Sequence, residues 1–194
     1  MRMLRLITAG CCLIALSACV ITRPPPKAAS EWSMRAQTLQ HANSWMLDGR
    51  AAVAAGTQGW QASLDWRQSD ASSELHLAGP LGIGAQAITQ TPSGISINGA
   101  APNDAALSQL QDRLGFALPI DELRFWLLGV PDPSSTFELT RNDQDRAQHL
   151  SQSGWSIDYD HYVAAGGDVL PGHIVLTRDD VRVRIVVDHW EVHL

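Results

Sequence analysis

Apolar and polar residues alternate along several segments of the chain, a pattern typical of a β-strand with one face in the core and the other in water. In the clearest segment, near the C-terminus, Arg182 and Arg184 separate the apolar residues Val181, Val183, Ile185 and Val187. The same alternation occurs at Trp60 to Trp66, Leu75 to Leu77, Ile95 to Ile97, Phe137 to Leu139 and Trp155 to Tyr159. Because glycine, proline and asparagine separate these half-buried segments, the pattern predicts a large antiparallel sheet or barrel.

Two other segments have the apolar spacing of an amphipathic helix. The first runs from Ala28 to about Asn43, and the second from about Asn103 to Leu114, where Gly115 is expected to end it. The sequence therefore predicts one helix before the strands and one in the middle of the sheet sequence.

A third predicted helix is apolar nearly all round. It begins near Pro119, in a position where proline is tolerated, and ends at Gly129. Arg124 alone interrupts the apolar residues Leu123, Phe125, Trp126, Leu127 and Leu128. Because such a helix must be covered on more than one side, we expect it inside or across a curved sheet. A core-filling plug and a movable lid fit this pattern equally well.

The N-terminus has the features of a bacterial lipoprotein signal. Arg2 and Arg5 precede an apolar stretch of eleven residues, Leu6 to Leu16, which is too short to span a bilayer. The stretch leads to Leu16-Ser17-Ala18-Cys19, the form in which bacteria attach lipid to a cysteine. We therefore expect a cleaved signal peptide over residues 1–18 and diacylglyceryl and N-acyl lipid on Cys19. An ordinary cleaved signal with Cys19 as a bystander is the alternative.

Residues 19–30 are predicted to form a lipidated, proline-rich tether, and residues 31–194 a single domain. Pro24-Pro25-Pro26 favours an extended polyproline II spacer that holds the domain off the bilayer. Val20 and Ile21 stand where an aspartate typically retains a lipoprotein in the inner membrane. Their identity favours the outer membrane.

Charge and cysteine content exclude several kinds of site. The chain has 14 basic and 20 acidic residues, and without Arg2 and Arg5 the balance is 12 to 20, a formal net charge of −8. Such a chain is a poor binder of nucleic acid, which needs clustered lysine and arginine. All three cysteines lie at or before position 19, so the domain has no thiol for a disulfide, metal or nucleophile. No apolar run after Leu16 approaches 18 residues, so we expect the lipid to be the only anchor of a soluble domain.

Several motifs in order along the chain resemble the LolB family of outer-membrane lipoproteins. They are Trp45 to Arg50, Leu64-Asp65-Trp66, Gly79-Pro80-Leu81-Gly82, Leu118-Pro119-Ile120, Trp126 to Gly129, Gln152 to Trp155, Leu170-Pro171 and Trp190. The resemblance implies a mainly β fold with some α: an unclosed barrel of about eleven antiparallel strands, whose helices cover an apolar cavity. The sequence departs from this pattern in Ala51 to Ala55, which give the concave face little bulk.

The resemblance also implies a function and partners. The protein would be an acceptor at the outer membrane that faces the periplasm, receives lipoprotein cargo from a LolA-like periplasmic carrier and inserts that cargo into the membrane. We expect a monomer that uses no nucleotide, metal or other cofactor and performs no enzymatic reaction. Acyl chains gain roughly 0.8 kcal/mol per buried CH₂, so they must stay covered throughout the transfer.

Leu81 is the sharpest candidate for a functional residue. It lies at the tip of Gly79-Pro80-Leu81-Gly82, between two strand-like segments, where it could enter a bilayer or fold back into the core. The residues alone favour the core, but in the resembling family the corresponding leucine is associated with membrane insertion. Strand parity and the third helix supply the candidates for the acyl-chain cavity: Leu64, Trp66, Leu75, Leu77, Phe125, Trp126, Leu128 and Ile185. Most of them could equally be core residues.

Enzymatic and nucleotide-binding alternatives have weak support. His189 and His193 share strand parity, but no third metal ligand stands nearby, and Asp158 and Asp160 are expected to be solvated. Gly82 to Ala87 has a dinucleotide-type glycine spacing, but strand-like residues follow it where a helix is required. An envelope scaffold lipoprotein or a periplasmic sensor of apolar ligands remains the alternative function.

Overall fold

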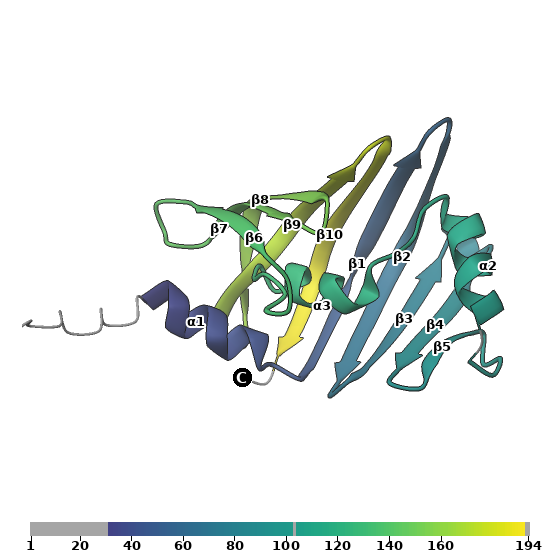
Figure 1. The fold of residues 1–194 in the computed structure, drawn as a ribbon, viewed down its shortest axis with the longest axis horizontal. Coiled ribbons are helices and arrows are strands. Elements are labelled where there is room, and N and C mark those ends of the chain that lie inside the picture. The colour runs from purple at the N-terminus through teal and green to yellow at the C-terminus, as the bar shows by residue number, and fades with distance from the viewer. Residues whose placement is uncertain (1–30, 103, 193–194) are drawn as a thin grey trace, which may run out of the picture.

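One curved antiparallel sheet forms most of the molecule (Figure 1). The computed structural model describes residues 31–192 except residue 103, so Cys19, the tether and His193 lie outside the described residues. The strands are β1 (Ser44–Ala55), β2 (Gln58–Ser69), β3 (Ser72–Ala78), β4 (Gln86–Thr91), β5 (Gly94–Ile97), β6 (Phe137–Arg141), β7 (Ala147–Gln152), β8 (Trp155–Ala165), β9 (Asp168–Arg178) and β10 (Val181–Val192).

The strand order is β5-β4-β3-β2-β1-β10-β9-β8-β7-β6, so the first and last strands meet at the centre. β5 and β6 form the two edges, and the barrel is unclosed, as the family resemblance implied. Within the described residues the sheet has ten strands, where the resemblance implied about eleven. β4 follows the glycines at 82 and 84, which agrees with the rejection of a dinucleotide fingerprint there.

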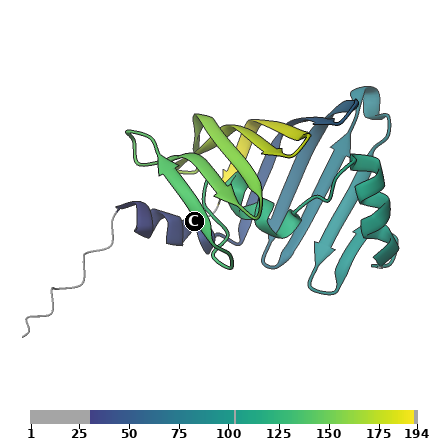
Figure 2. The same ribbon diagram turned by 45° about the horizontal axis from the view of Figure 1, so that its top comes forward.

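In the described part of the chain, three α-helices accompany the sheet: α1 (Glu31–Gln40), α2 (Asp104–Leu114) and α3 (Ile120–Leu127). α3 crosses the inner face in front of β10 and β1 (Figures 1 and 2), as expected for a helix that is apolar nearly all round. α2 packs near the β5 edge, and α1 is held to the start of β9 by the Arg35 guanidinium, which donates to the Val169 carbonyl at 2.7 Å. None of the described helices is long and apolar enough to cross a membrane.

A bulge in β10 explains why its simple alternation ends at Val187. The register with β1 shifts between Asp48 and Gly49, so that Asp188 is an extra residue and both Val187 and Trp190 face the core. Gly49 permits this close approach, because a Cβ there would lie 2.3 Å from the Val186 carbonyl oxygen. The bulge thus changes which positions of β10 face the core, from odd-numbered residues before Asp188 to even-numbered residues after it.

The prediction of a half-buried strand at Phe137 to Leu139 is wrong in its burial. β6 forms there, but Phe137 is 47% exposed and only Leu139 is half-buried. β6 is the last strand of the sheet and has a neighbour on one side only. An edge strand can therefore carry an apolar residue that packs against little else.

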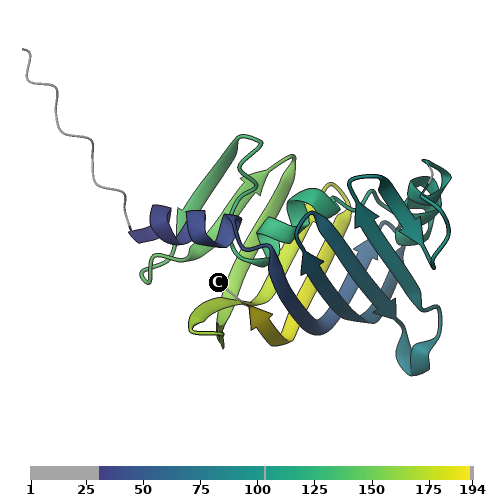
Figure 3. The same ribbon diagram turned by 90° about the horizontal axis from the view of Figure 1, so that it is seen from below.

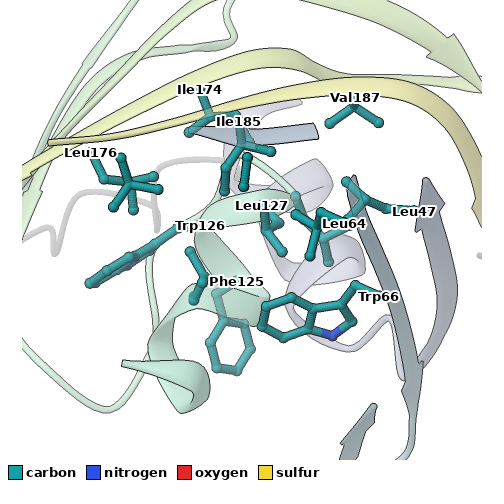
Figure 4. Packing of buried hydrophobic residues seen from close by; sticks show 14 of the residues in the cluster. Leu47, Leu64, Trp66, Phe125, Trp126, Leu127, Ile174, Leu176, Ile185 and Val187 are labelled. Atoms are coloured by element: carbon teal, nitrogen blue, oxygen red, sulfur yellow. The ribbon is translucent and has the colours of Figure 1, made fainter. Parts of the chain in front are cut away.

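The core lies between the inner face of the sheet and α3 (Figure 4). Trp126 and Leu127 of α3 are fully buried, and they share one apolar cluster with Leu47, Leu64 and Ile185 of the central strands. At the base of this cluster the Trp45 ring stacks on Trp66 with a centroid distance of 5.8 Å. These side chains therefore pack together on the inner face beneath α3.

Candidate functional site

An apolar pocket of about 530 Å³ opens on the inner face beyond the reach of α3. Its walls come from β2, β3, the start of β4, the C-terminal end of α2 and the loop between β3 and β4: Trp60, Gln61, Ala62, Leu77, Gly79, Ile83, Gly84, Gln86 and Leu114. Strand parity places Trp60, Ala62 and Leu77 on one face, and the small Ala62 side chain leaves space between the larger ones. The volume and apolar walls suit a hydrocarbon chain.

One wall of the pocket carries an unpaired hydrogen-bond donor. The indole Nε1 of Trp60 is buried and has no hydrogen-bond partner among the residues that the structure describes. A buried indole N–H usually finds an acceptor, because leaving it unpaired costs about 1–3 kcal/mol. Because this nitrogen is buried, a ligand in the pocket could accept its hydrogen bond only after the Trp60 side chain shifts.

The predicted cavity residues divide into two groups. Leu77 lines the pocket. The other seven are buried in the core around α3 and do not line it: Leu64, Trp66, Leu75, Phe125, Trp126, Leu128 and Ile185. They could reach an acyl chain only if α3 moved, and their role as acyl-chain contacts stays a prediction.

Hydrogen bonds hold α3 in place from the sheet side. The Tyr159 hydroxyl of β8 donates to the Trp126 carbonyl at 2.9 Å. Burial, with smaller effects from Tyr162 and Asp158, raises the pKa of Tyr159 well above its ordinary value, so the hydroxyl stays protonated and can donate. Of the two roles left open for this helix, the structure favours the plug.

The loop between β3 and β4 presents Leu81 to solvent. Leu81 is 100% exposed within the short helical turn η1 (Pro80–Gly82), so it does not fold back into the core. Its backbone is left-handed, with φ of 59° and ψ of 23°, which is unfavourable for leucine. Three backbone hydrogen bonds among Gly79, Gly82 and Ile83 and their neighbours close the loop, including Gly79 N to Ile83 O at 3.0 Å. The loop therefore displays its leucine at a conformational cost.

Sequence reasoning missed Ile83, which is 73% exposed and lines the rim of the pocket. It also missed Leu114, whose apolar side faces the same space. The signal for Ile83 was present, since an isoleucine between two glycines has few neighbours along the chain that could cover it. Together Leu81 and Ile83 make the loop an apolar projection beside an apolar pocket.

The paired aspartates that the sequence analysis considered as a candidate site, Asp158 and Asp160, lie on the outer face of the sheet. Asp158 Oδ1 lies 2.7 Å from Nδ1 of His149, whose Nε2 lies 3.2 Å from the Ser151 hydroxyl. Asp160 binds a different histidine, His173, at 2.5 Å, so the two aspartates do not form a carboxylate pair. The side chains of Asp158 and Asp160 are 56% and 64% exposed, so both aspartates are solvated, as predicted.

Metal ligands do not gather anywhere in the described part of the chain. No group of three or more histidine, cysteine, aspartate or glutamate side chains there is placed to hold a metal ion. His189 is exposed on β10, and its predicted companion His193 falls outside the described residues.

Comparisons with known proteins agree with this architecture. The family described as "Outer membrane lipoprotein LolB" matches residues 43–190. An outer-membrane lipoprotein LolB from Nitrosococcus oceani is 34% identical over 190 residues, covering 93% of this chain and 94% of its own length. A LolB from Pseudomonas fluorescens is 32% identical and covers 84% of this chain and 81% of its own.

Among solved structures, a LolA superfamily protein from Nitrosomonas europaea has a similar fold. The TM-score is 0.51 at 11% sequence identity, and the match covers 82% of this chain and 94% of that one. At this identity the likeness concerns the fold alone, which is the unclosed sheet with helices on its inner face.

Proposed function

The chain belongs to the LolB family of outer-membrane lipoproteins, and from this premise we propose that its inner-face pocket receives the acyl chains of other lipoproteins on their way into the outer membrane. The protein is an outer-membrane lipoprotein, the description that its relatives' names carry, and as a member of the LolB family it acts in lipoprotein localisation. The cargo would come from a LolA-like periplasmic carrier, and the chain would act as a monomer held by diacylglyceryl and N-acyl lipid on Cys19.

The observation that carries this proposal is the position of the pocket beside the exposed loop. The Ile83 side chain belongs to both, since it lines the pocket and stands next to the projecting Leu81 turn. An acyl chain leaving the pocket would therefore meet apolar side chains at once. Exposing a chain of about 16 carbons to water would cost on the order of 10 kcal/mol, so a covered route is a requirement of the transfer.

The pocket walls support a ligand with a hydrocarbon chain. Leu77, Ala62 and Leu114 would contact the hydrocarbon. Acyl chains on a lipoprotein end in ester or amide carbonyl groups, which accept hydrogen bonds. The Trp60 indole could donate to such a carbonyl only after its side chain shifts, because its Nε1 is buried.

The direction of transfer needs no nucleotide or cofactor. It requires only that the acyl chains bind more tightly to this pocket than to the carrier, and more tightly to the membrane than to this pocket. Lipid on Cys19 would fix the acceptor at the destination membrane, and Leu81 would enter that membrane to open a path for the cargo.

The test uses the full mature chain with Cys19→Ala, mixed with a LolA-like carrier loaded with labelled lipoprotein. We expect the label to move to the chain, and Ile83→Glu to reduce this transfer several-fold, because a charge would then stand at the pocket rim. Phe137→Glu is the matched control, since it adds the same charge at an exposed apolar position on the far edge of the sheet.

Failure of the wild-type chain to accept label would defeat the acceptor role and favour a scaffold or a sensor of apolar ligands. Equal transfer by the Ile83→Glu and wild-type chains would instead show that the pocket is not the entry route.

A further inference from the structure

A second groove, of about 630 Å³, lies on the outer face of the sheet beneath the Leu81 loop. The loop projects on the side of the sheet away from the helices (Figure 3) and overhangs outward-facing residues of β1, β2 and β10. Pro80, Leu81 and Gly82 form one wall of this groove, and Arg50, Ala52 and Arg184 contribute to the opposite side.

The groove exists because small residues stand where β3 ends. β3 stops at Ala78, opposite Ser63, while β1 and β2 continue beyond that level and leave their outer face open. There Ala52 pairs with Gln61 on one side and with Arg184 on the other. The alanine-rich part of β1, which gives little bulk to the inner face, thus also leaves room on the outer face below the loop.

The groove is basic, although the whole chain carries a formal net charge of −6. The charge of Arg50 is matched by Asp188, whose carboxylate accepts two hydrogen bonds at 2.8 and 3.1 Å. Arg184 has only Ala52 and Val175 as its cross-strand neighbours, so no carboxylate stands directly beside it on either strand. Among the residues that the structure describes, the Arg184 guanidinium has no carboxylate partner, and it borders a groove large enough to hold a polar headgroup.

We propose that this groove binds the phosphate of an anionic phospholipid in the membrane that Leu81 enters, with Arg184 as its principal ligand. The inference rests on the proposed function, because it requires the loop to reach a membrane. With the apolar tip among acyl chains, the base of the loop lies at the level of the headgroups, where arginine and phosphate form forked hydrogen bonds.

Phosphate chemistry points to the membrane and not to the cargo. The lipid on a lipoprotein is a diacylglyceryl group with an N-linked acyl chain, which carries no phosphate for a guanidinium to bind. The outer groove and the inner pocket would therefore take different lipids on opposite faces of the sheet. The groove would orient the acceptor on the bilayer while the pocket holds the cargo.

The test measures binding of the full mature Cys19→Ala chain to phosphatidylethanolamine vesicles with and without phosphatidylglycerol. Because a basic residue near an anionic surface contributes about fivefold to binding, Arg184→Gln should weaken binding to the anionic vesicles about fivefold. Arg182→Gln is the matched control, since Arg182 is exposed on the same face of β10 but does not line the groove. Arg182→Gln should weaken binding less than about twofold if the vesicles bind through the groove and not through the general charge of this face.

Equal losses of vesicle binding in the two arginine variants, or no loss in Arg184→Gln, would overturn the proposal that the groove binds phospholipid. Binding of inorganic phosphate tighter than about 1 mM without vesicles would assign the site to a free anion and overturn the lipid assignment. Leu81→Asn tests the underlying function separately. If that variant binds vesicles as the wild type does, membrane entry by the loop fails, whatever Arg184→Gln shows.

Discussion

The side-chain oxygen of Gln152 accepts a hydrogen bond from the indole N–H of Trp126 at 2.8 Å and so joins α3 to β7. The same oxygen accepts from the Asp132 backbone N–H at 2.9 Å, and the amide nitrogen donates to the Asp132 carbonyl at 2.8 Å. Gln152 is only 3% exposed, so this network has no competing water around most of its atoms. Gln152 and Tyr159 thus both hold the C-terminal end of α3, through the indole and the carbonyl group of Trp126.

Replacing Gln152 by alanine should destabilise the fold. The change leaves the buried Trp126 indole N–H and the Asp132 backbone N–H without an acceptor, which should lower the free energy of unfolding by about 2–4 kcal/mol. Urea unfolding followed by tryptophan fluorescence measures this change. Gln37→Ala, at an exposed position of α1, is the control and should alter stability by less than about 0.5 kcal/mol. A loss no larger than that of the control would mean that α3 is not fixed by this network.

α2 lies at one side of the inner-face pocket. Among its described side chains only Leu110 and Leu114 are buried. Its C-terminal Gly115 has φ of +81°, and a Cβ built there would lie 3.2 Å from Cβ of Ala55. Leu114 of α2 lines the pocket, so α2 is the candidate for a lid over it.

A disulfide between residues 55 and 115 should therefore block cargo entry. In an Ala55→Cys/Gly115→Cys chain carrying Cys19→Ala, the two Cβ atoms need to move apart by only a few tenths of an ångström to reach disulfide geometry. We expect the oxidised protein to accept labelled cargo about tenfold less than the reduced protein, because apparent affinity falls in proportion to the fraction of molecules whose pocket is open. The reduced double variant controls for the strain of cysteine at Gly115. Equal acceptance in the two redox states would show that α2 need not move.

The sequence predicted those strands that have one face in the core and the other exposed to solvent. Residues 60–66 and 181–187 alternate because helices and core cover one side only, and the structure confirms both. β6 could not be predicted in the same way, because an edge position is a property of the whole sheet. The bulge at Asp188 was also invisible in the alternation, since nothing in the residues themselves marks an extra residue against β1.

The candidate site was predictable to a smaller extent. Parity correctly placed Leu77 and Leu64 on the inner face, but only Leu77 lines the pocket, because the reach of α3 decides which part of that face stays open. The exposure of Leu81 could not be derived from the residues alone either. It depends on a left-handed turn that the hydrogen bonds of Gly79 and its neighbours enforce.

Leu81→Asn should separate stability from membrane insertion. Asparagine tolerates left-handed backbone better than leucine, so the variant should be as stable as the wild type or up to about 1 kcal/mol more stable. It should still receive cargo from a carrier, but insert it into vesicles several-fold more slowly, because the apolar tip is lost. Leu81→Met keeps an apolar tip and should insert cargo normally. Unimpaired insertion by Leu81→Asn would remove Leu81 from the mechanism.

The pKa of Asp65 leads to a pH-dependent prediction. Asp48 and Asp65 are direct cross-strand neighbours on the outer face. Partial burial raises the pKa of Asp65 above 3.8, its hydrogen bond with Asp48 and the charge of Asp48 raise it further, and His76 opposes the shift. Because the folded state then holds this proton more tightly than the unfolded state, the contribution of Asp65 to stability is present at low pH and is lost as the pH rises through its folded-state pKa.

Asp65→Asn removes that loss, so it should stabilise the protein near pH 7 by about 0.2–1 kcal/mol, the usual cost of like charges directly opposite each other in a sheet. The gain should disappear near about pH 3, where Asp65 is protonated in both states. Urea unfolding at the two pH values measures the difference. Asp143→Asn, at an exposed position between β6 and β7, should show no such pH-dependent gain. A gain of equal size at both pH values would trace the effect to something other than the charge of Asp65.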